Sequence, residues 1–407
     1  MRPRLNKKAR KRIDEEALQT LRDPRFLYNA SQKVAELGVV GEKRNRLTMI
    51  LACITRHTPD PVSIILQAPP GSGKTTLMRS AVRLFPPDYV TERAGLSKKA
   101  LAFGKRSLKN TVLVINEYKC GKDAQLFIRL TQSGEDIAHE YTTISGRRRQ
   151  TEVVKRTGTP VVLTTTTDER IFPDDASRFL ALHVDSSPKQ NRAIVLARAK
   201  KPRIVNLGDL PVWQAAMAKL KCKADDFQHP PRFLADVAKR LPLNDVSVRR
   251  QWNRILSFLS AAALVRGFES KQPVDIEFAD YCVVYRILEP ILVSALQRPN
   301  TPESQVARAT AALNKRLGRS VTVRELAKKL NWKEPRVYKH VTTAARQKLV
   351  KYESGSRERN LRPIIARKET SRRFLPSPRS VLRRNREIGK KVKYVDPFTG
   401  KRKKVER

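Results

Sequence analysis

The chain has 407 residues, and its 84 Lys and Arg against 39 Asp and Glu give a formal net charge of +45 at pH 7. So large an excess repels itself unless a polyanion is bound, which makes nucleic acid the first partner to consider, ahead of an anionic membrane surface. The 40% of hydrophobic residues excludes a wholly disordered chain, and no apolar run predicts a membrane span. The four cysteines are scattered singly, which argues against a zinc module or disulfide framework and favours a reducing, cytoplasmic location.

Five regions of different composition follow one another along the chain. Residues 1–24 are a basic arm, and residues 25–185 alternate β-branched runs with helix-like segments, which predicts an α/β core with a parallel sheet. Helical periodicity dominates residues 186–300, and residues 301–352 are typical of helix, helix, turn and helix. Residues 353–407 hold 19 Lys and Arg against 6 Asp and Glu with few large apolar residues. We therefore expect this tail to be disordered without a partner.

Within the α/β core, short β-branched runs predict five strands. The run that precedes Asn116 is apolar at every position, as expected of a central strand that is buried on both faces. The predicted strands are Val62–Leu66, Tyr89–Glu92, Thr111–Ile115, Val161–Thr164 and Phe179–Val184.

The strongest motif lies between the first strand and a helix-like run from Thr75 to Leu84. In such a loop glycines let backbone N–H groups turn inward around phosphates, and the following helix N-terminus adds partial positive charge. Lys74 would reach the β- and γ-phosphates, and the Thr75 hydroxyl would ligate Mg²⁺. Ala68 departs from the usual pattern, in which glycine begins the loop; the alternative is a chance glycine-rich turn. We predict a loop for ATP and Mg²⁺ made of Pro69, Pro70, Gly71, Ser72, Gly73, Lys74, Thr75 and Thr76.

A second strand end supplies the acidic group that ATP hydrolysis needs. Asn116 and Glu117 follow the apolar strand Thr111–Ile115, and Glu117 is the candidate for the base that orients water. Asn116 stands where Asp is usual, and a neutral amide would hold Mg²⁺ less strongly. The alternative is that both residues simply open a loop.

The strand that begins at Val161 ends in hydroxyl residues, Thr164 to Thr167. The order of phosphate loop, acidic strand end, this polar strand end and Ser177-Arg178-Phe179 resembles AAA+ ATPases over about residues 25–185. It is similar in particular to helicase-like ATPases of phages and integrative elements, distant relatives of minichromosome-maintenance helicases. The resemblance implies a homo-oligomeric ring in which Arg178 reaches a neighbour's γ-phosphate, with Arg170 as a competitor and a solvated Arg178 as the alternative. It also implies sensors, for which the candidates are Thr166, Thr167, Arg249 and Arg250; residues 186–300 would be a helical lid.

Two segments are candidates for contact with DNA, whether single- or double-stranded. The segment from His139 to Arg149 predicts a hairpin with a basic tip, which would grip the phosphate backbone or be an ordinary charged loop. Residues 301–352 resemble a winged helix-turn-helix, with a protein-docking domain as the alternative. The candidate DNA-binding residues are Arg147, Arg148, Arg149, Arg336, Lys339 and His340.

The sequence thus predicts an AAA+ ATPase core with a helical lid and a winged helix, acting as a Mg-ATP-dependent DNA motor and in particular as a helicase. An AAA+ regulator or loader without unwinding activity needs the same phosphate loop, the same base and the same arginine that reaches a neighbour's γ-phosphate (an arginine finger). It therefore stays an alternative. A catalytically inactive DNA-binding scaffold is the third possibility, and Asn116 is the residue that favours it.

Overall fold

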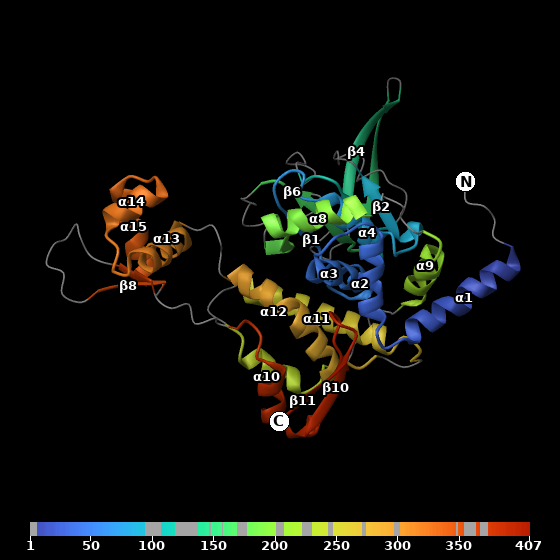
Figure 1. The fold of residues 1–407 in the computed structure, drawn as a ribbon. Coiled ribbons are helices and arrows are strands. Elements are labelled where there is room, and N and C mark those ends of the chain that lie inside the picture. The colour runs from blue at the N-terminus through green and yellow to red at the C-terminus, as the bar shows by residue number, and fades with distance from the viewer. Residues whose placement is uncertain are drawn as a thin grey trace. The chain divides into compact units, whose positions relative to one another are not determined.

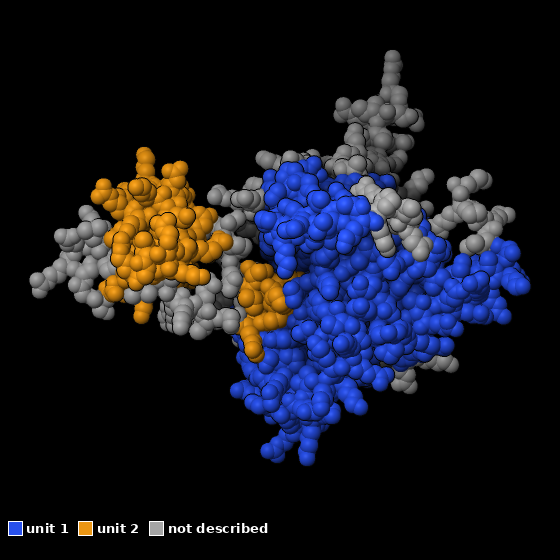
Figure 2. Space-filling view, viewed as in Figure 1, with its two compact units in different colours: residues 1–288, 375–407 blue, residues 289–374 orange. Residues whose placement is uncertain are grey.

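The computed structural model describes the chain in segments that form two compact units (Figure 2), unit 1 made of Met1–Leu288 with Leu375–Arg407 and unit 2 of Glu289–Phe374. The described residues are 6–93, 107–118, 137–145, 148–156, 158–168, 177–200, 207–221, 230–242, 247–270, 274–296, 302–346, 349–353, 364–366 and 373–407.

Unit 1 is built around a parallel five-stranded sheet (Figure 1). Its strand order is β2-β3-β6-β1-β7, and every neighbouring pair is parallel. Each of the five strands predicted from β-branched runs is present to within one or two residues at either end. Their bounds are β1 (Ile64–Gln67), β2 (Val90–Arg93), β3 (Val112–Ile115), β6 (Val161–Thr166) and β7 (Leu180–His183). The predicted α/β class with a parallel sheet is therefore confirmed.

The centre of the sheet is buried on both faces. All residues of β3 and β6 are buried, as are Ile64, Ile65 and Leu66 of β1. Ile65, Leu113 and Val162 pack on one face together with Phe179. Since helices cover parallel sheets on both sides, the apolar runs that mark these strands have no polar alternation.

The helices of unit 1 before the C-terminal segment belong to the basic arm, the α/β core and the expected lid region, and the last of them, α12, continues past Leu288 into unit 2. From Asn45 to Ile54 every residue of α3 is buried, so this helix forms part of the core. No helix among the described residues is long and apolar enough to cross a membrane. The bounds are α1 (Lys7–Arg22), α2 (Phe26–Glu36), α3 (Lys43–Ile54), α4 (Lys74–Val82), α8 (Pro188–Lys200), α9 (Leu210–Lys219), α10 (Phe233–Lys239), α11 (Ser247–Arg266) and α12 (Phe278–Leu296), with short 3-10 turns η1 (Thr55–His57) and η2 (Pro87–Tyr89).

The basic N-terminal arm contains the regular helix α1. Its Asn6 side chain accepts a hydrogen bond from the N–H of Ala9 (2.8 Å), which caps the helix. Ala17 and Leu21 are buried, and Asp14 pairs with Lys219 of α9 (3.4 Å). α1 therefore has an apolar stripe and a polar opposite face, and it packs against α9.

A long antiparallel hairpin lies between β3 and β6 in the sequence, where the sequence predicts one. It consists of β4 (Ile137–Ser145) and β5 (Arg148–Arg156), with Ser145 opposite Arg148 in the register. Arg148 and Arg149 therefore begin the second strand next to the turn, while Arg147 lies outside the described residues.

Unit 2 contains the order of elements that the sequence predicts for residues 301–352, helix, helix, turn and helix, followed by a small hairpin. Thr322 and Glu325 form a capping box at the start of its second helix, and Asn331 ends that helix in the left-handed region (φ 54°). The core includes Val323, Leu326, Ala327, Val337 and Val341. The elements are α13 (Pro302–Leu317), α14 (Val323–Leu330), α15 (Glu334–Arg346), β8 (Val350–Tyr352) and β9 (Ile364–Ala366).

The expectation of a disordered tail is wrong for residues 373–407. This segment folds into α16 (Pro378–Arg384), η4 (Arg386–Ile388) and the antiparallel hairpin of β10 (Lys391–Val395) and β11 (Arg402–Glu406). Its few apolar residues suffice because Leu375, Val381 and Leu382 are completely buried. The basic side chains face outward around them, so the high net charge does not prevent folding.

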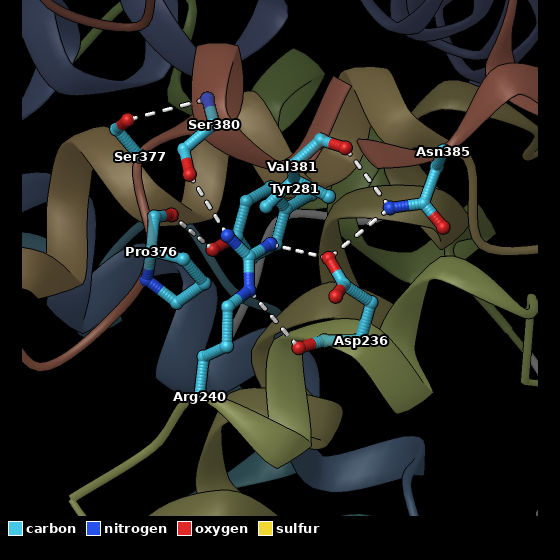
Figure 3. Close-up of polar contacts among 8 residues, drawn as sticks. All are labelled: Asp236, Arg240, Tyr281, Pro376, Ser377, Ser380, Val381 and Asn385. Atoms are coloured by element: carbon cyan, nitrogen blue, oxygen red, sulfur yellow. Dashed lines mark hydrogen bonds and ion pairs between the residues drawn. The ribbon is translucent and has the colours of Figure 1, made fainter. Parts of the chain in front are cut away.

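Polar contacts fix α16 against α10 and α12 (Figure 3). Arg240 donates to the Ser380 hydroxyl (2.8 Å) while it is paired with Asp236, and Asn385 also donates to Asp236 (3.2 Å). The Tyr281 hydroxyl donates to the Pro376 carbonyl (2.6 Å). The C-terminal segment is therefore an integral part of unit 1.

The turn between β10 and β11 packs on the helices of unit 1 through one buried carboxylate and one aromatic ring. The Asp396 side chain is inaccessible to solvent, accepts a hydrogen bond from Arg286 of α12 (2.9 Å) and pairs with Lys403. The guanidinium groups of Arg44 and Arg286 lie 5.3 and 5.6 Å from the centre of the Phe398 ring. These contacts join α3 and α12 through the turn.

We expect Asp396→Asn to lower the free energy of unfolding at pH 7 by about 1–3 kcal/mol, since it removes a charged partner of Arg286 and Lys403. Burial raises the pKa of Asp396, but the hydrogen bonds from Lys403 and the Phe398 N–H and the charge of Arg286 more than offset it, so the pKa lies below its usual value. The stabilisation is therefore complete above the unfolded pKa, about 3.9, and disappears as the pH falls through the folded value.

The check is urea unfolding of parent and variant across pH. The gap between their midpoints is expected at pH 7 and should narrow below about pH 4. Glu387→Gln is the control, because its carboxylate pairs with Arg232 and both side chains are exposed. Equal midpoints for parent and Asp396→Asn at pH 7 would mean that this carboxylate does not hold the turn.

Candidate functional site

The predicted phosphate loop joins β1 to α4 and has the backbone that phosphate binding needs. Gly71 and Gly73 have φ angles of +75° and +90°, which side-chain-bearing residues rarely adopt. A Cβ atom built on either glycine would meet no atom within 4 Å, so space is open over the loop. Gly73 is the residue before α4, whose first-turn N–H groups lack helical partners. The loop thus offers an open surface of backbone donors.

Lys74 begins α4 and turns back over the loop. Its ammonium donates to the carbonyls of Ala68 (2.5 Å) and Pro69 (2.9 Å), and the residue is only 8% exposed. Burial lowers the pKa of Lys74, while the charge of the Glu117 carboxylate acts in the opposite direction. The fold therefore brings Glu117, from the end of β3, into electrostatic range of the loop lysine.

The end of β3 presents one carboxylate and one amide beside the loop. Glu117 is exposed, whereas Asn116 is half-buried and receives a hydrogen bond on its backbone carbonyl from the Thr165 hydroxyl. The Asn116 Oδ1 atom is buried and has no hydrogen-bond partner among the described residues. An unpartnered buried oxygen at this place is available to a water molecule or an ion.

The hydroxyls of neighbouring threonines at the end of β6 have different partners. Thr166 accepts a hydrogen bond from the N–H of Asp168 (3.1 Å), so its hydroxyl stabilises the turn after the strand. Thr165, which the sequence analysis did not select, contacts Asn116 instead. Neighbouring residues of a strand point to opposite faces, so Thr165 and Thr166 point to different sides of the sheet. This alternation could have identified Thr165 from the sequence. Thr167 is half-buried, and its sensor role stays a prediction.

The residues around the loop fit Mg²⁺ bound together with a nucleotide. Magnesium prefers oxygen ligands and keeps most of its coordination for water and substrate phosphates. Thr75 at the second position of α4 and the unpartnered Asn116 Oδ1 supply two such oxygens, and the Ser72 hydroxyl is likewise buried without a partner among the described residues. Those residues contain no cluster of three or more His, Cys, Asp or Glu suited to a metal. The site therefore fits a cation that is held chiefly by the nucleotide.

Arg178 lies just before β7, and two arginines of α11 hold the adjacent residue. Arg250 donates to the Ser177 hydroxyl, and Arg254 donates to the Ser177 carbonyl (2.6 Å). Arg254 is buried, which lowers its pKa to about 10, with a smaller contribution from the nearby Arg250 charge. It stays charged at neutral pH. Arg250 thus contacts the segment of the predicted finger, while Arg249 is exposed on the same helix and Arg170 lies outside the described residues.

Among the DNA-contact candidates of α15, two face solvent and one does not. Arg336 and Lys339 are exposed, and the Arg336 guanidinium stacks 4.4 Å from the centre of the Trp332 ring. His340 turns toward α13 instead, where its Nδ1 atom lies 2.9 Å from the Glu303 carboxylate. The sequence predicts a DNA contact for His340, which needs a ring that faces solvent, whereas His340 is half-buried. It lies three residues after Val337 and beside the buried stripe of the helix, which explains the difference.

A search of curated proteins finds no match to the chain. Among solved structures, a full-length MCM homolog from Methanopyrus kandleri matches with a TM-score of 0.44 and 11% identity, over 71% of this chain and 62% of that one. The Aeropyrum pernix ORC1 protein in complex with DNA matches with a TM-score of 0.25 and 16% identity, over 82% and 88%. The JCV helicase matches with a TM-score of 0.26 and 12% identity, over 66% and 77%. This chain thus spans less than two thirds of the MCM homolog.

A family model, described as the MTBMA_p00010 P-loop domain, matches residues 14–219, just over half of the chain. The match includes the whole parallel sheet, the glycine loop and Glu117, and it ends at the last residue of α9. Together with the parallel sheet and the strand–loop–helix geometry, it confirms the predicted α/β fold class with a P-loop domain. The chain therefore belongs to the MTBMA_p00010 P-loop domain family.

Proposed function

We propose that the protein is a Mg-ATP-dependent motor that acts on DNA, in particular a replicative-type helicase of a phage or mobile element. One observation carries the proposal: the parallel sheet places the loop after β1, with Lys74, and the end of β3, with Glu117, at the same sheet edge, where the charge of Glu117 acts on Lys74. Phosphoryl transfer to water needs a cation at the β- and γ-phosphates and a carboxylate near the attacking water. Both are supplied at one sheet edge, by the ends of the two strands that flank β6.

The residues of this chain have distinct roles in the proposed hydrolysis. The loop N–H groups and Lys74 bind the phosphates, and Lys74 exchanges its two loop carbonyls for phosphate oxygens. Glu117 accepts a proton from the attacking water. Thr75 and Asn116 would hold Mg²⁺, which when bound would neutralise charge on the β- and γ-phosphates. The amide of Asn116 contributes no charge, so the phosphates themselves must provide most of the attraction for the cation.

The charge of the chain supports DNA as the partner. A formal charge of +45 is far beyond what a protein without a polyanionic partner needs for solubility. The β4–β5 hairpin begins its second strand with Arg148 and Arg149, and α15 exposes Arg336 and Lys339. We propose that the β4–β5 hairpin contacts the DNA backbone. We also propose that unit 2 is a winged helix that enters the major groove.

Strand displacement on a forked DNA duplex tests the motor. The full chain with ATP and Mg²⁺ is expected to separate the strands, and Glu117→Gln is expected to leave them paired. Hydrolysis without displacement would identify the loader or regulator described above. DNA binding without hydrolysis would identify a scaffold that uses ATP only as a structural ligand.

We further propose that Arg178 completes a neighbour's site in a homo-oligomeric ring. Arg178→Ala should then bind ATP but hydrolyse it poorly, because a guanidinium stabilises charge that develops in the transition state. Mixing Arg178→Ala with Glu117→Gln should restore part of the turnover, since some interfaces would join the intact Glu117 of one subunit to the intact Arg178 of another.

The control for this experiment is Arg178→Ala mixed with Lys74→Ala;Arg178→Ala, in which no interface contains both an intact phosphate site and an intact finger. Co-assembly is checked by pull-down of differently tagged subunits. If Arg178→Ala and Glu117→Gln co-assemble without any recovery of turnover, Arg178 does not act across subunits.

A further inference from the structure

The hairpin of β10 and β11 has two chemically different faces. The inward face carries Val392, Tyr394 and, on the facing strand, Lys403 and Val405, all of them half-buried. Burial raises the pKa of Tyr394, and the only cation on this face, Lys403, is paired with the buried Asp396. Every charge on the inward face is therefore neutralised within unit 1.

The outward face is basic and exposed. Alternation along the two strands places four cations there, and the only acid among them is Glu406, which pairs with Lys391 (3.3 Å) and Lys404 (3.1 Å). Within the part of the chain that the structure describes, neither Lys393 nor Arg402 has a carboxylate in ion-pair distance. The exposed cations are Lys391, Lys393, Arg402 and Lys404.

The register places two of these cations directly opposite each other. Lys393 is paired with Lys404 across the hairpin, next to the pair of Val395 and Arg402. Like charges on directly opposed residues destabilise a sheet. The Lys393–Lys404 pair therefore lowers the stability of the hairpin, while it concentrates charge where an external anion can approach.

The spacing of the outward cations suits an extended row of phosphates. Alternate residues of one strand lie about 6.6 Å apart and neighbouring strands about 4.8 Å apart, so the cations form a grid rather than a single cavity. The hairpin is rigidly attached, because Asp396 and Phe398 fix its turn to α3 and α12 and α16 is bound to α10. A rigid grid of cations matches a polymer of regularly spaced charges better than a single small anion.

We infer that the outward face of the β10–β11 hairpin is a second DNA-binding surface, which contacts the phosphate backbone through Lys393, Arg402 and Lys404. The inference rests on DNA as the partner in the proposed function, but it does not depend on hydrolysis. The C-terminal hairpin would contact only the DNA backbone and would not recognise bases. Base recognition would be left to the exposed residues of α15.

The test is a triple variant of the full chain, Lys393→Gln, Arg402→Gln and Lys404→Gln, in DNA binding across a salt series. Each lost phosphate contact reduces the slope of log K against log salt by about 0.9 for duplex DNA and about 0.7 for a single strand. The triple variant should therefore bind more weakly at low salt, with a slope shallower by about 2–3 on a duplex. Duplex and single-stranded oligonucleotides form separate arms and show which form the surface prefers.

The matched control removes the same charge elsewhere, with Lys7, Lys8 and Lys11 of α1 each changed to Gln; all three are exposed. Equal losses in the two variants would show a general effect of net charge and would overturn the inference, as would an unchanged slope in the hairpin variant. A parent chain that binds no DNA at any salt would instead overturn the proposed function itself.

Two further measurements distinguish a binding surface from other roles. The melting temperature of the hairpin variant should be equal to or above that of the parent, because the Lys393–Lys404 repulsion is removed; a lower value would show that these cations stabilise the fold. Vesicles of phosphatidylserine and phosphatidylcholine are the second probe. A variant that loses vesicle binding and keeps DNA binding would assign the surface to membranes and overturn the inference.

Discussion

Lys74→Ala is expected to weaken ATP binding by about 100-fold or more, because it removes charge-assisted hydrogen bonds to two phosphates worth about 3 kcal/mol in total. The fold should persist, since the Ala68 and Pro69 carbonyls that Lys74 contacts lie in an exposed loop where water can replace the ammonium. The measurement is the dissociation constant for Mg-ATP by calorimetry, beside the melting temperature of each protein without nucleotide.

Lys8→Ala is the control, because it removes the same charge from an exposed position of α1. It should bind ATP as the parent does. Parent-like affinity in Lys74→Ala would mean that the loop after β1 does not bind phosphates, and a large fall in melting temperature would mean that Lys74 serves mainly to hold the loop.

Glu117→Gln should bind ATP normally and lose hydrolysis by about 10²–10⁴-fold, since an amide cannot accept the proton of the attacking water. The carboxylate is exposed and therefore needs no rearrangement of the core to reach a water molecule. Single-turnover hydrolysis at saturating ATP separates this loss from any change in binding.

Glu92→Gln is the matched control from the neighbouring strand, where Glu92 pairs with Arg79 (2.7 Å). It should hydrolyse ATP at the rate of the parent. Undiminished hydrolysis in Glu117→Gln would place the base elsewhere, and Glu169, which lies outside the described residues, would be the next to test.

The parallel sheet and the phosphate loop were predictable from the sequence because each has a local signal. A strand buried on both faces must be apolar at every position, as in Val112–Ile115. The loop needs glycine where φ is positive, and Gly71 and Gly73 meet that need. Such signals depend on a few neighbouring residues, so they survive without any knowledge of the rest of the fold.

Contacts between distant segments could not be predicted in the same way. The charge of Arg254 favours a surface position, yet the residue is buried against the Ser177 carbonyl, 77 positions away. In residues 373–407, 13 basic residues conceal the pattern of a few apolar ones, and composition alone predicts disorder. The segment folds because Leu382 and Phe398 meet surfaces that earlier helices provide, and no local pattern reveals those surfaces.

The most direct test of the central claim is the rate of ATP hydrolysis by the full chain with Mg²⁺, measured without DNA and then with forked DNA. The proposed motor predicts hydrolysis that DNA increases and that Lys74→Ala and Glu117→Gln both abolish. Hydrolysis no faster than that of Lys74→Ala, with or without DNA, would contradict the assignment of this chain as a DNA-dependent ATPase.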